Sequence, residues 1–200
     1  MQAKSILNGK GITLIELMVA LVICGIVMGA IYRLFITQTR AYTVQDQVAE
    51  VQQSVRSAME ILVRDLRMAG SETLAVPIVT PVASNSITVN YQASQITYSI
   101  VGGSLRRTLG DGTFEVILPN VNSFILTYGI DADGNHIVDD QNGNGLVDTG
   151  DYIAAGAVGA NRIIGIRMQL SANPSPNNPD ALAQVSPRTL DSTVSLRNLL

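Results

Sequence analysis

Tryptophan is absent from this 200-residue chain, and three Phe and six Tyr are its only aromatic residues. Any core must therefore rest on Val, Ile and Leu. The single cysteine, Cys24, excludes a disulfide within the chain. No lysine follows Lys10, so that 11 Arg are set against 16 Asp plus Glu. This acidic balance argues against general nucleic-acid binding, because neutralisation of phosphates drives that affinity.

Charge is missing altogether from one long stretch near the amino terminus. No residue from Leu17 to Tyr32 carries a formal charge, and residues 12–36 are mostly aliphatic. A helix over residues 12–36 would reach ~37 Å at ~1.5 Å per residue, enough for a bilayer core of ~30 Å. The lysines before it orient the amino terminus toward the cytoplasm. A plain anchor or a signal peptide would show the same hydropathy, but no convincing small-residue cleavage site follows the stretch.

Glu16 lies at the edge of this apolar stretch. A carboxylate costs roughly 2.5–3.5 kcal/mol at the bilayer centre and less near an interface, so Glu16 predicts a cationic partner. The run from Gly11 to Leu17, Gly-Ile-Thr-Leu-Ile-Glu-Leu, resembles the signature of type IV prepilins. The resemblance implies that a prepilin peptidase cleaves after Gly11 and methylates the new amino terminus at Ile12. It also implies that Glu16, fifth after the cut, pairs with the amine of a neighbouring subunit in the filament.

The implied pairing is physically reasonable. An ammonium and a carboxylate that meet in apolar surroundings offset each other's desolvation, whereas a misregistered neighbour leaves both uncompensated. Ile12 departs from the Phe that most family members carry, although the position tolerates other apolar residues. Gly25 and Gly29 form a GxxxG pair, which indicates either a helix-packing face or a weak point in the helix.

Proline and glycine are missing from Ala30 to Ala69. Apolar residues recur in this stretch at steps of three and four, which predicts an amphipathic helix. They are Ala41, Val44, Val48, Val51, Val55, Ala58, Leu62, Leu66 and Ala69. Gly70 predicts the C-terminal stop. The sequence therefore predicts one helix from about Ile12 to Ala69, whose apolar stripe either seats a following domain or forms a coiled coil.

From Leu74 onward the period changes to that of β-strands. Strands are predicted at residues 86–91, 95–100, 104–109, 114–118, 121–128, 163–170 and 189–196. Gly102-Gly103 and Asp111-Gly112 predict hairpin turns, and residues 173–179 form a polar loop. We expect an α+β fold in which the long N-terminal helix packs on an antiparallel β-sheet. The expected divisions are a leader at 1–11, a transmembrane half-helix at 12–36, an amphipathic half-helix at 37–70 and a β-rich head at 71–200.

Two further segments narrow the resemblance. Residues 58–70 resemble the end of the long helix in PilW-type minor pilins and, more loosely, in the J-type minor pseudopilins of type II secretion. Residues 194–198 resemble the closing strand of both groups. The resemblance implies a structural subunit for assembly or priming of a type IV pilus. The alternatives are a minor pseudopilin of a type II secretion system, or an adhesin or DNA-binding pilus-tip subunit.

The same resemblance implies partners and a location. The partners are other pilin or pseudopilin subunits, prepilin peptidase, the inner-membrane assembly machinery and membrane lipid, and no nucleic acid is expected. The chain would cross the bacterial inner membrane once with its amino terminus in the cytoplasm. It would then enter the pilus with its head in the periplasm or outside the cell. An enzyme is not expected, because the sequence offers no Ser/His/Asp-like set and its one cysteine lies in the apolar stretch.

An acidic loop over residues 131–151 contains a nine-residue tandem repeat. D-A-D-G-N-H-I-V-D at 131–139 is followed at once by D-Q-N-G-N-G-L-V-D at 140–148. The second copy extends into an EF-hand-like calcium loop, because alternate short Asp and Asn side chains can direct oxygens inward around a glycine turn. Its predicted ligands are Asp140, Asn142, Asn144, the carbonyl of Leu146, Asp148 and Asp151.

The first copy predicts a second, overlapping metal site. Its ligands would be Asp131, Asp133, Asn135 and Asp139. This site should be weaker, because His136 replaces the turn glycine. In the second copy, Asp151 stands where a calcium loop usually has a long bidentate Glu, and we expect this shorter side chain to loosen the site. The alternative for both copies is a solvated turn rich in Asp, Asn and Gly.

Overall fold

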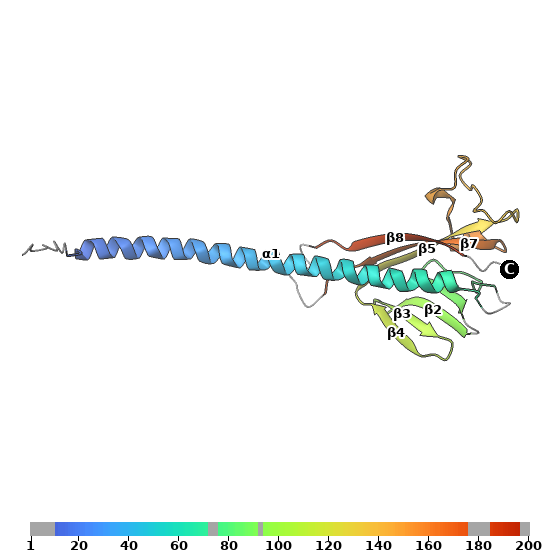
Figure 1. The fold of residues 1–200 in the computed structure, drawn as a ribbon, viewed down its shortest axis with the longest axis horizontal. Coiled ribbons are helices and arrows are strands. Elements are labelled where there is room, and N and C mark those ends of the chain that lie inside the picture. Colours follow the sequence, from blue (N-terminus) through green and yellow to red (C-terminus); the bar gives the residue numbers. More distant parts are fainter. Residues whose placement is uncertain (1–10, 72–75, 92–93, 176–184, 197–200) are drawn as a thin grey trace, which may run out of the picture. The chain divides into compact units, whose positions relative to one another are not determined.

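The structure, a computed structural model, describes residues 11–71, 76–91, 94–175 and 185–196 (Figure 1). The chain divides into two compact units, Met1–Thr43 and Val44–Leu200. The first unit contains the beginning of the long helix. The second contains the rest of that helix and all of the described β-strands.

Helix α1 runs without interruption from Leu14 to Met68, within two residues of its predicted bounds. Gly70 ends it with a φ of +76°, a left-handed conformation in which glycine avoids the strain of a side chain. The Gly70 amide then donates to the carbonyl of Asn90 at 2.8 Å, which ties the end of the helix to the first strand.

Four strands form the first antiparallel sheet, in the order β1-β2-β3-β4. They are β1 (Ser86–Tyr91), β2 (Ser94–Val101), β3 (Ser104–Leu109) and β4 (Phe114–Leu118). Gly102 and Gly103 join β2 to β3 with φ values of +59° and +73°, so both central residues of this turn use the conformation that tight hairpins require. These four strands lie close to their predicted positions.

A second antiparallel sheet has the order β6-β5-β7-β8. Its strands are β5 (Val121–Asp131), β6 (Ile153–Ala154), β7 (Arg162–Ala172) and β8 (Arg188–Ser195). The acidic loop, the 3-10 helix η1 (Thr149–Asp151) and the short helix α2 (Ala155–Val158) lie between β5 and β7. Part of the predicted polar loop, residues 176–179, and Arg197 and Asn198 lie outside the described residues.

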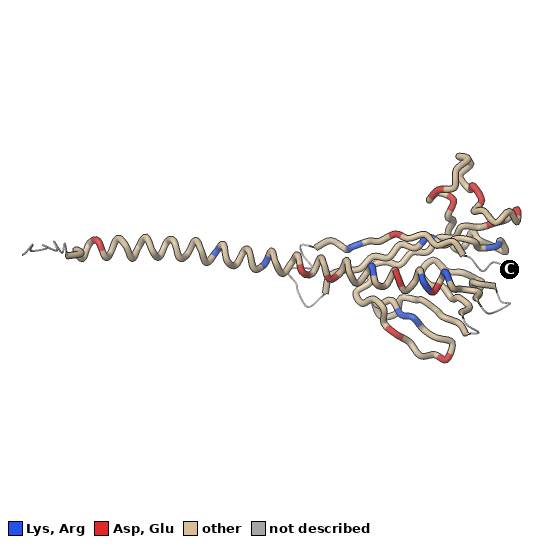
Figure 2. Tube along the Cα trace, in the orientation of Figure 1, with Lys and Arg blue, Asp and Glu red and all other residues tan. Residues whose placement is uncertain are grey.

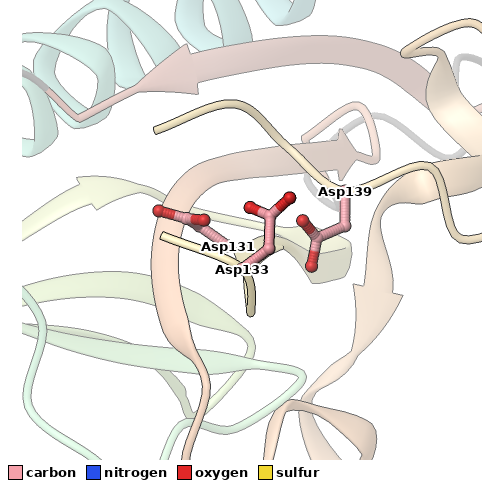
Figure 3. Close-up of side chains that lie close together, drawn as sticks. All are labelled: Asp131, Asp133 and Asp139. Atoms are coloured by element: carbon pink, nitrogen blue, oxygen red, sulfur yellow. The ribbon is translucent and has the colours of Figure 1, made fainter. Parts of the chain in front are cut away.

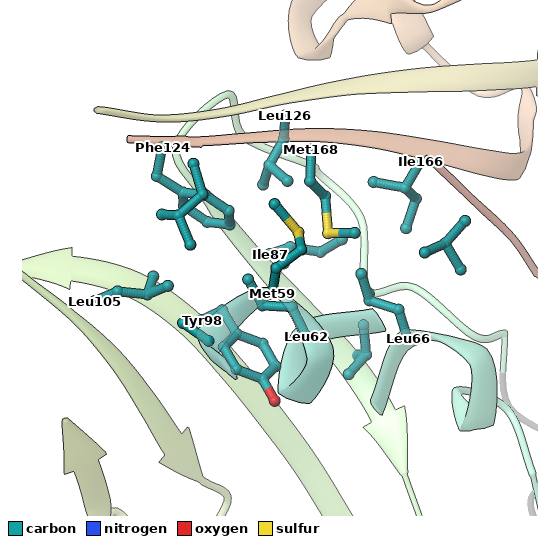
Figure 4. Close-up of a cluster of buried hydrophobic side chains, with 14 of the residues drawn as sticks. Met59, Leu62, Leu66, Ile87, Tyr98, Leu105, Phe124, Leu126, Ile166 and Met168 are labelled. Atoms are coloured by element: carbon teal, nitrogen blue, oxygen red, sulfur yellow. The ribbon is translucent and has the colours of Figure 1, made fainter. Parts of the chain in front are cut away.

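The core lies between the two sheets and the second half of α1. Figure 4 shows Met59, Leu62 and Leu66 of the helix among side chains from both sheets. The sheets contribute Ile87, Tyr98, Leu105, Phe124, Leu126, Ile166 and Met168, all of them buried. The predicted apolar stripe is buried from Val51 to Ala69. Within the second unit the stripe therefore packs against the domain that follows the helix. Burial of this apolar surface supplies the main favourable free energy of the fold.

The division into two sheets differs from the single sheet expected. The buried face of α1 is wider than the predicted stripe, since it also includes Met59 and Asp65. A buried face of that width can pack against one sheet on each side. Strand β5 pairs with β7 instead of extending the first sheet beyond β4. The α+β class and the packing of the long helix on antiparallel sheets agree with a type IV pilin fold.

Candidate functional site

The predicted processing site lies where the described chain begins. Gly11 and Ile12 are exposed and precede the first helical residue. Nothing lies within 4 Å of the position that a side chain at Gly11 would occupy. An exposed, non-helical segment suits a peptidase, which must reach the backbone of the bond that it cleaves. The rest of the leader, residues 1–10, lies outside the described residues.

Glu16 closes a capping box at the start of α1. The Thr13 amide and the Thr13 hydroxyl each donate to Glu16 Oε2 at 3.3 Å. The Glu16 amide donates in return to Thr13 Oγ1 at 3.3 Å. This reciprocal pattern satisfies amide groups that the first turn leaves without helical partners. Within the described part of the chain Glu16 forms no salt bridge, so its charge remains available to a cation from outside.

The helix beyond Glu16 presents apolar side chains on every face. Residues 14–31 are all exposed, and α1 is long and apolar enough to cross a membrane. Cys24 is exposed, and side chains at Gly25 and Gly29 would meet nothing within 4 Å. A helix that is apolar all round is not stable facing water, and therefore calls for lipid or neighbouring helices. The hydropathy and the structure thus agree on a membrane-anchoring helix.

The first copy of the acidic repeat is anchored on the second sheet. Val138 is half-buried, and a Cβ atom added to Gly129 would come within 2.8 Å of Val138 Cγ2. The close approach therefore depends on the glycine. The Asp139 amide donates to the Ile130 carbonyl at 2.9 Å. Asp131, at the end of β5, begins the turn and is almost fully buried.

Both copies of the repeat form the same turn. Asp131 accepts hydrogen bonds from the amides three, four and five residues later in the first copy. Asp140 does the same in the second copy, where the three distances are 2.6, 3.2 and 2.6 Å. His136 has a φ of +65° at the place where Gly145 has +79°. The histidine therefore adopts the turn conformation without glycine, which non-glycine residues seldom do.

The structure gathers carboxylates in the first copy of the repeat. Oxygens of Asp131, Asp133 and Asp139 all lie within 4.8 Å of one another (Figure 3). These are hard oxygen donors, which fit the coordination chemistry of Ca²⁺. In the second copy both Asp148 oxygens accept hydrogen bonds from the side-chain amides of Asn142 and Asn144. The residues predicted for both sites thus lie in turns of one kind, while the three-carboxylate group belongs to the copy expected to bind more weakly.

Two buried carboxylates of the loop are held in the charged form. The Asp148 amide donates to Asp151 Oδ2 at 2.7 Å, and this bond and other backbone donors lower the pKa of Asp151. Burial raises the pKa of Asp131, but hydrogen bonds from the amides of Gly134 and His136 outweigh it and leave that pKa below its usual value. Both groups are therefore ionised at neutral pH, as a cation site requires.

A buried polar group that the sequence analysis missed joins α1 to the first sheet. Asp65 is 1% exposed and accepts at Oδ2 from the Tyr98 hydroxyl at 2.5 Å and from Arg107 Nε at 2.8 Å. Burial and the neighbouring Asp65 raise the pKa of Tyr98, so the hydroxyl keeps the proton that it donates. Burial lowers the pKa of Arg107, but its hydrogen bonds to Asp65 and Tyr98 raise it overall. The burial of Asp65 had one signal in the sequence, because Asp65 lies three residues after Leu62 and so falls on the apolar face of the helix.

This arrangement separates the basic pair Arg106-Arg107. Successive side chains of a strand point to opposite faces of the sheet. Arg107 turns inward to Asp65, whereas the Arg106 guanidinium lies 4.6 Å from the centre of the Phe114 ring. The pair therefore does not form a continuous basic surface of the kind that would favour a DNA-binding tip.

Comparison with known protein families matches residues 7–32 to the prokaryotic N-terminal methylation motif. The matched segment contains Gly11, Ile12 and Glu16 and much of the apolar half of α1. It supports a type IV pilin-like family, whose subunits are structural, and it implies processing by prepilin peptidase and assembly with other pilins. No curated protein matches the chain.

Proposed function

We propose that this chain is a minor pilin of the PilW-like group, a structural subunit for assembly or priming of a type IV pilus. The observation that carries the pilin-like part of the proposal is the arrangement at its amino terminus, whereas the PilW-like part rests on the resemblance of residues 58–70. An exposed Gly11-Ile12 bond precedes a capped apolar helix, and Glu16 in the first turn forms no salt bridge among the described residues. Cleavage would place a new amine four residues before this carboxylate. The head then lies outside the cytoplasm once the helix spans the inner membrane.

A minor pseudopilin of a type II secretion system is the second candidate, on the resemblance of residues 58–70. It shares the processing site, the span and the acidic residue, so these features favour neither system. Gene neighbourhood separates the two. Genes for a pilus ATPase and other minor pilins beside this one favour the pilus, and genes for a secretion channel favour the pseudopilus.

Blocking the cleavage is the direct test of processing. Co-expressed with a prepilin peptidase, the wild-type chain should lose residues 1–11 and begin with N-methylated Ile12, as measured by intact mass and N-terminal sequencing. Gly11→Val should remain at full length, because a branched side chain would crowd the bond that the peptidase must bind. A side chain at Gly11 meets nothing within 4 Å in the chain itself, so the loss would not reflect misfolding.

Gly25→Val is the matched control for this experiment. Gly25 lies within α1, where a side chain would have equal room, and it is distant from the cut. Its variant should be processed like the wild type. A mature terminus at any residue other than Ile12, or normal cleavage of Gly11→Val, would overturn the proposed processing.

We further propose that the acidic loop binds Ca²⁺. The support is the donor set, since three carboxylates of the first copy lie within 4.8 Å of one another and the second copy repeats the same turn. A carboxylate has about four lone-pair positions, so one that accepts amide hydrogen bonds can still take part in coordination. Asp131, Asp133, Asn135 and Asp139 would hold one ion. Asp140, Asn142, Asn144, Leu146, Asp148 and Asp151 would hold another. A bound cation would order a loop that is too polar to pack on the core.

Calcium should raise the melting temperature of the full-length protein in detergent. At a free concentration a hundredfold above Kd, one site adds about 2.7 kcal/mol, which corresponds to roughly 5–10 °C for a head of this size. Asp133→Asn and Asp148→Asn remove charge but keep a hydrogen-bond acceptor, and each should reduce the calcium-dependent increase. Asp111→Asn, in a turn of the first sheet outside the loop, should leave it unchanged. Coincident melting curves with calcium and with chelator would end the calcium proposal.

A further inference from the structure

A groove of about 510 Å³ runs along the second half of α1 beside strand β8. Its floor is apolar, because Met59 is buried and Val63 and Leu190 are partly buried. Strand β8 is the last strand of the second sheet, so its outer edge is not used in the ladder of described strands. Apolar surface beside a free strand edge is a common place for another chain to bind.

The rim of this groove is strongly basic. Arg56, Arg64 and Arg67 line it from the helix, against a single acidic residue, Glu60. All four side chains are exposed. Arg64 lies 3.4 Å from Asp65 but its side chain is 65% exposed, so most of it is free to meet another partner. Figure 2 shows blue positions, which mark Lys and Arg, among red ones along the second half of α1.

The acidic loop carries the complementary surface. Residues 131–151 include six Asp and no Lys or Arg. Among them Leu146 is 70% exposed, Ile137 58% and Val147 52%. The loop therefore presents apolar side chains between acidic ones, and its own chain leaves these apolar side chains uncovered. The groove has the opposite arrangement, with an apolar floor between basic residues. Both halves of a matching contact are therefore present on one chain, and the described residues do not use them with one another.

We propose that the groove between α1 and β8 binds the acidic loop of a second copy of this chain. The contact joins two different surfaces, so a pair of copies keeps one free groove and one free loop. The proposal rests on the function proposed above, in which the chain assembles with other pilin-like subunits. The two proposed Ca²⁺ ions would still leave the loop negative, since it carries six carboxylates.

Cross-linking between two tagged copies of the full-length chain tests this contact in membranes. Both copies carry Cys24→Ala; one adds Glu60→Cys at the groove and the other Thr149→Cys in the loop. A short bis-maleimide should give a dimer that carries both tags. A control copy carries Ser99→Cys, on the first sheet, instead of Glu60→Cys. It measures cross-linking by random collision and should give roughly tenfold less of the dimer that carries both tags. Equal yields from the two positions would overturn the proposal.

Charge reversal separates a specific contact from proximity. Arg56→Glu with Arg67→Glu should lower the dimer yield by at least roughly tenfold, because like charges then meet across the interface. Arg106→Glu, a reversal on the first sheet, should not lower it. Melting temperatures of these variants close to that of the parent exclude misfolding as the cause.

The outcomes also distinguish this inference from the proposed function. If the chain is cleaved after Gly11 and enters filaments but forms no mixed dimer, the contact is wrong and the function stands. The same holds if Glu60→Cys cross-links only to another protein. If the chain is not cleaved after Gly11, the proposed function fails whatever the cross-linking shows.

Discussion

Replacing Glu16 by Ala should leave cleavage after Gly11 intact and reduce incorporation into filaments by at least about a hundredfold. In the proposed assembly the carboxylate meets the amine of a neighbour in apolar surroundings. Removing one partner of such a buried pair costs about 3–5 kcal/mol, because the other charge is left uncompensated. The measurement is the amount of the chain in sheared filaments relative to the processed chain in membranes.

The capping box at the start of α1 requires a control, since Glu16→Ala also removes hydrogen bonds to Thr13. Thr13→Val removes the hydroxyl and its part in the box but keeps the carboxylate. Loss of a helix cap costs typically ~1 kcal/mol, so this variant should still enter filaments. If Thr13→Val is excluded as fully as Glu16→Ala, capping rather than pairing explains the defect. Normal incorporation of Glu16→Ala would contradict the pairing itself.

Replacing Asp65 by Ala should destabilise the head by about 3 kcal/mol. The substitution leaves the Tyr98 hydroxyl and the Arg107 guanidinium without their common acceptor. The range for breaking a buried pair is about 3–5 kcal/mol, and the lower end applies because the Arg107 side chain is 20% exposed and can reach water. Urea denaturation followed by circular dichroism measures the change, since the chain has no tryptophan.

Two further variants show whether the effect belongs to the buried group. Glu60→Ala changes an exposed acidic residue of the same helix and should stay within about 0.5 kcal/mol of the wild type. The double variant Asp65→Ala with Arg107→Ala should lose less than the two single changes together, because it leaves no unpaired guanidinium. If Asp65→Ala is as stable as Glu60→Ala, the hydrogen bonds of Asp65 to Tyr98 and Arg107 do not stabilise the packing of α1 on the first sheet.

Local patterns in the sequence predicted most of the fold. The apolar run from Ile12, the spacing of apolar residues and the absence of proline and glycine from Ala30 to Ala69 predicted the bounds of α1 to within two residues, because helix formation depends on residues three and four apart. Alternation and paired glycines located the hairpins of the first sheet in the same way. The pairing of β5 with β7 rather than β4 could not be predicted, since it joins segments that are distant in sequence.

In the candidate site too, features set by neighbouring residues could be predicted, and features set by distant residues could not. Gly11 and Glu16 were identified by a short motif. The capping box was also readable, because Thr13 precedes Glu16 by three residues, yet its significance emerged only from the structure. The buried Asp65 needed partners 33 and 42 residues away, which no local pattern reveals. The three-carboxylate group falls in the first copy because Asp133 stands at the position that Asn142 occupies in the second. The sequence instead predicted the first copy to be the weaker site, on His136 alone.

The two copies of the acidic repeat have a consequence for how this chain can change over generations. Each copy is closed by the hydrogen bonds of its own leading aspartate, at Asp131 or at Asp140, and each has the same two positions of positive φ. If the gene gained or lost one whole nine-residue copy, the remaining copies would therefore keep their turns. Relatives of this chain should differ in the length of this loop by multiples of nine residues, with β5 and β7 unaltered on either side.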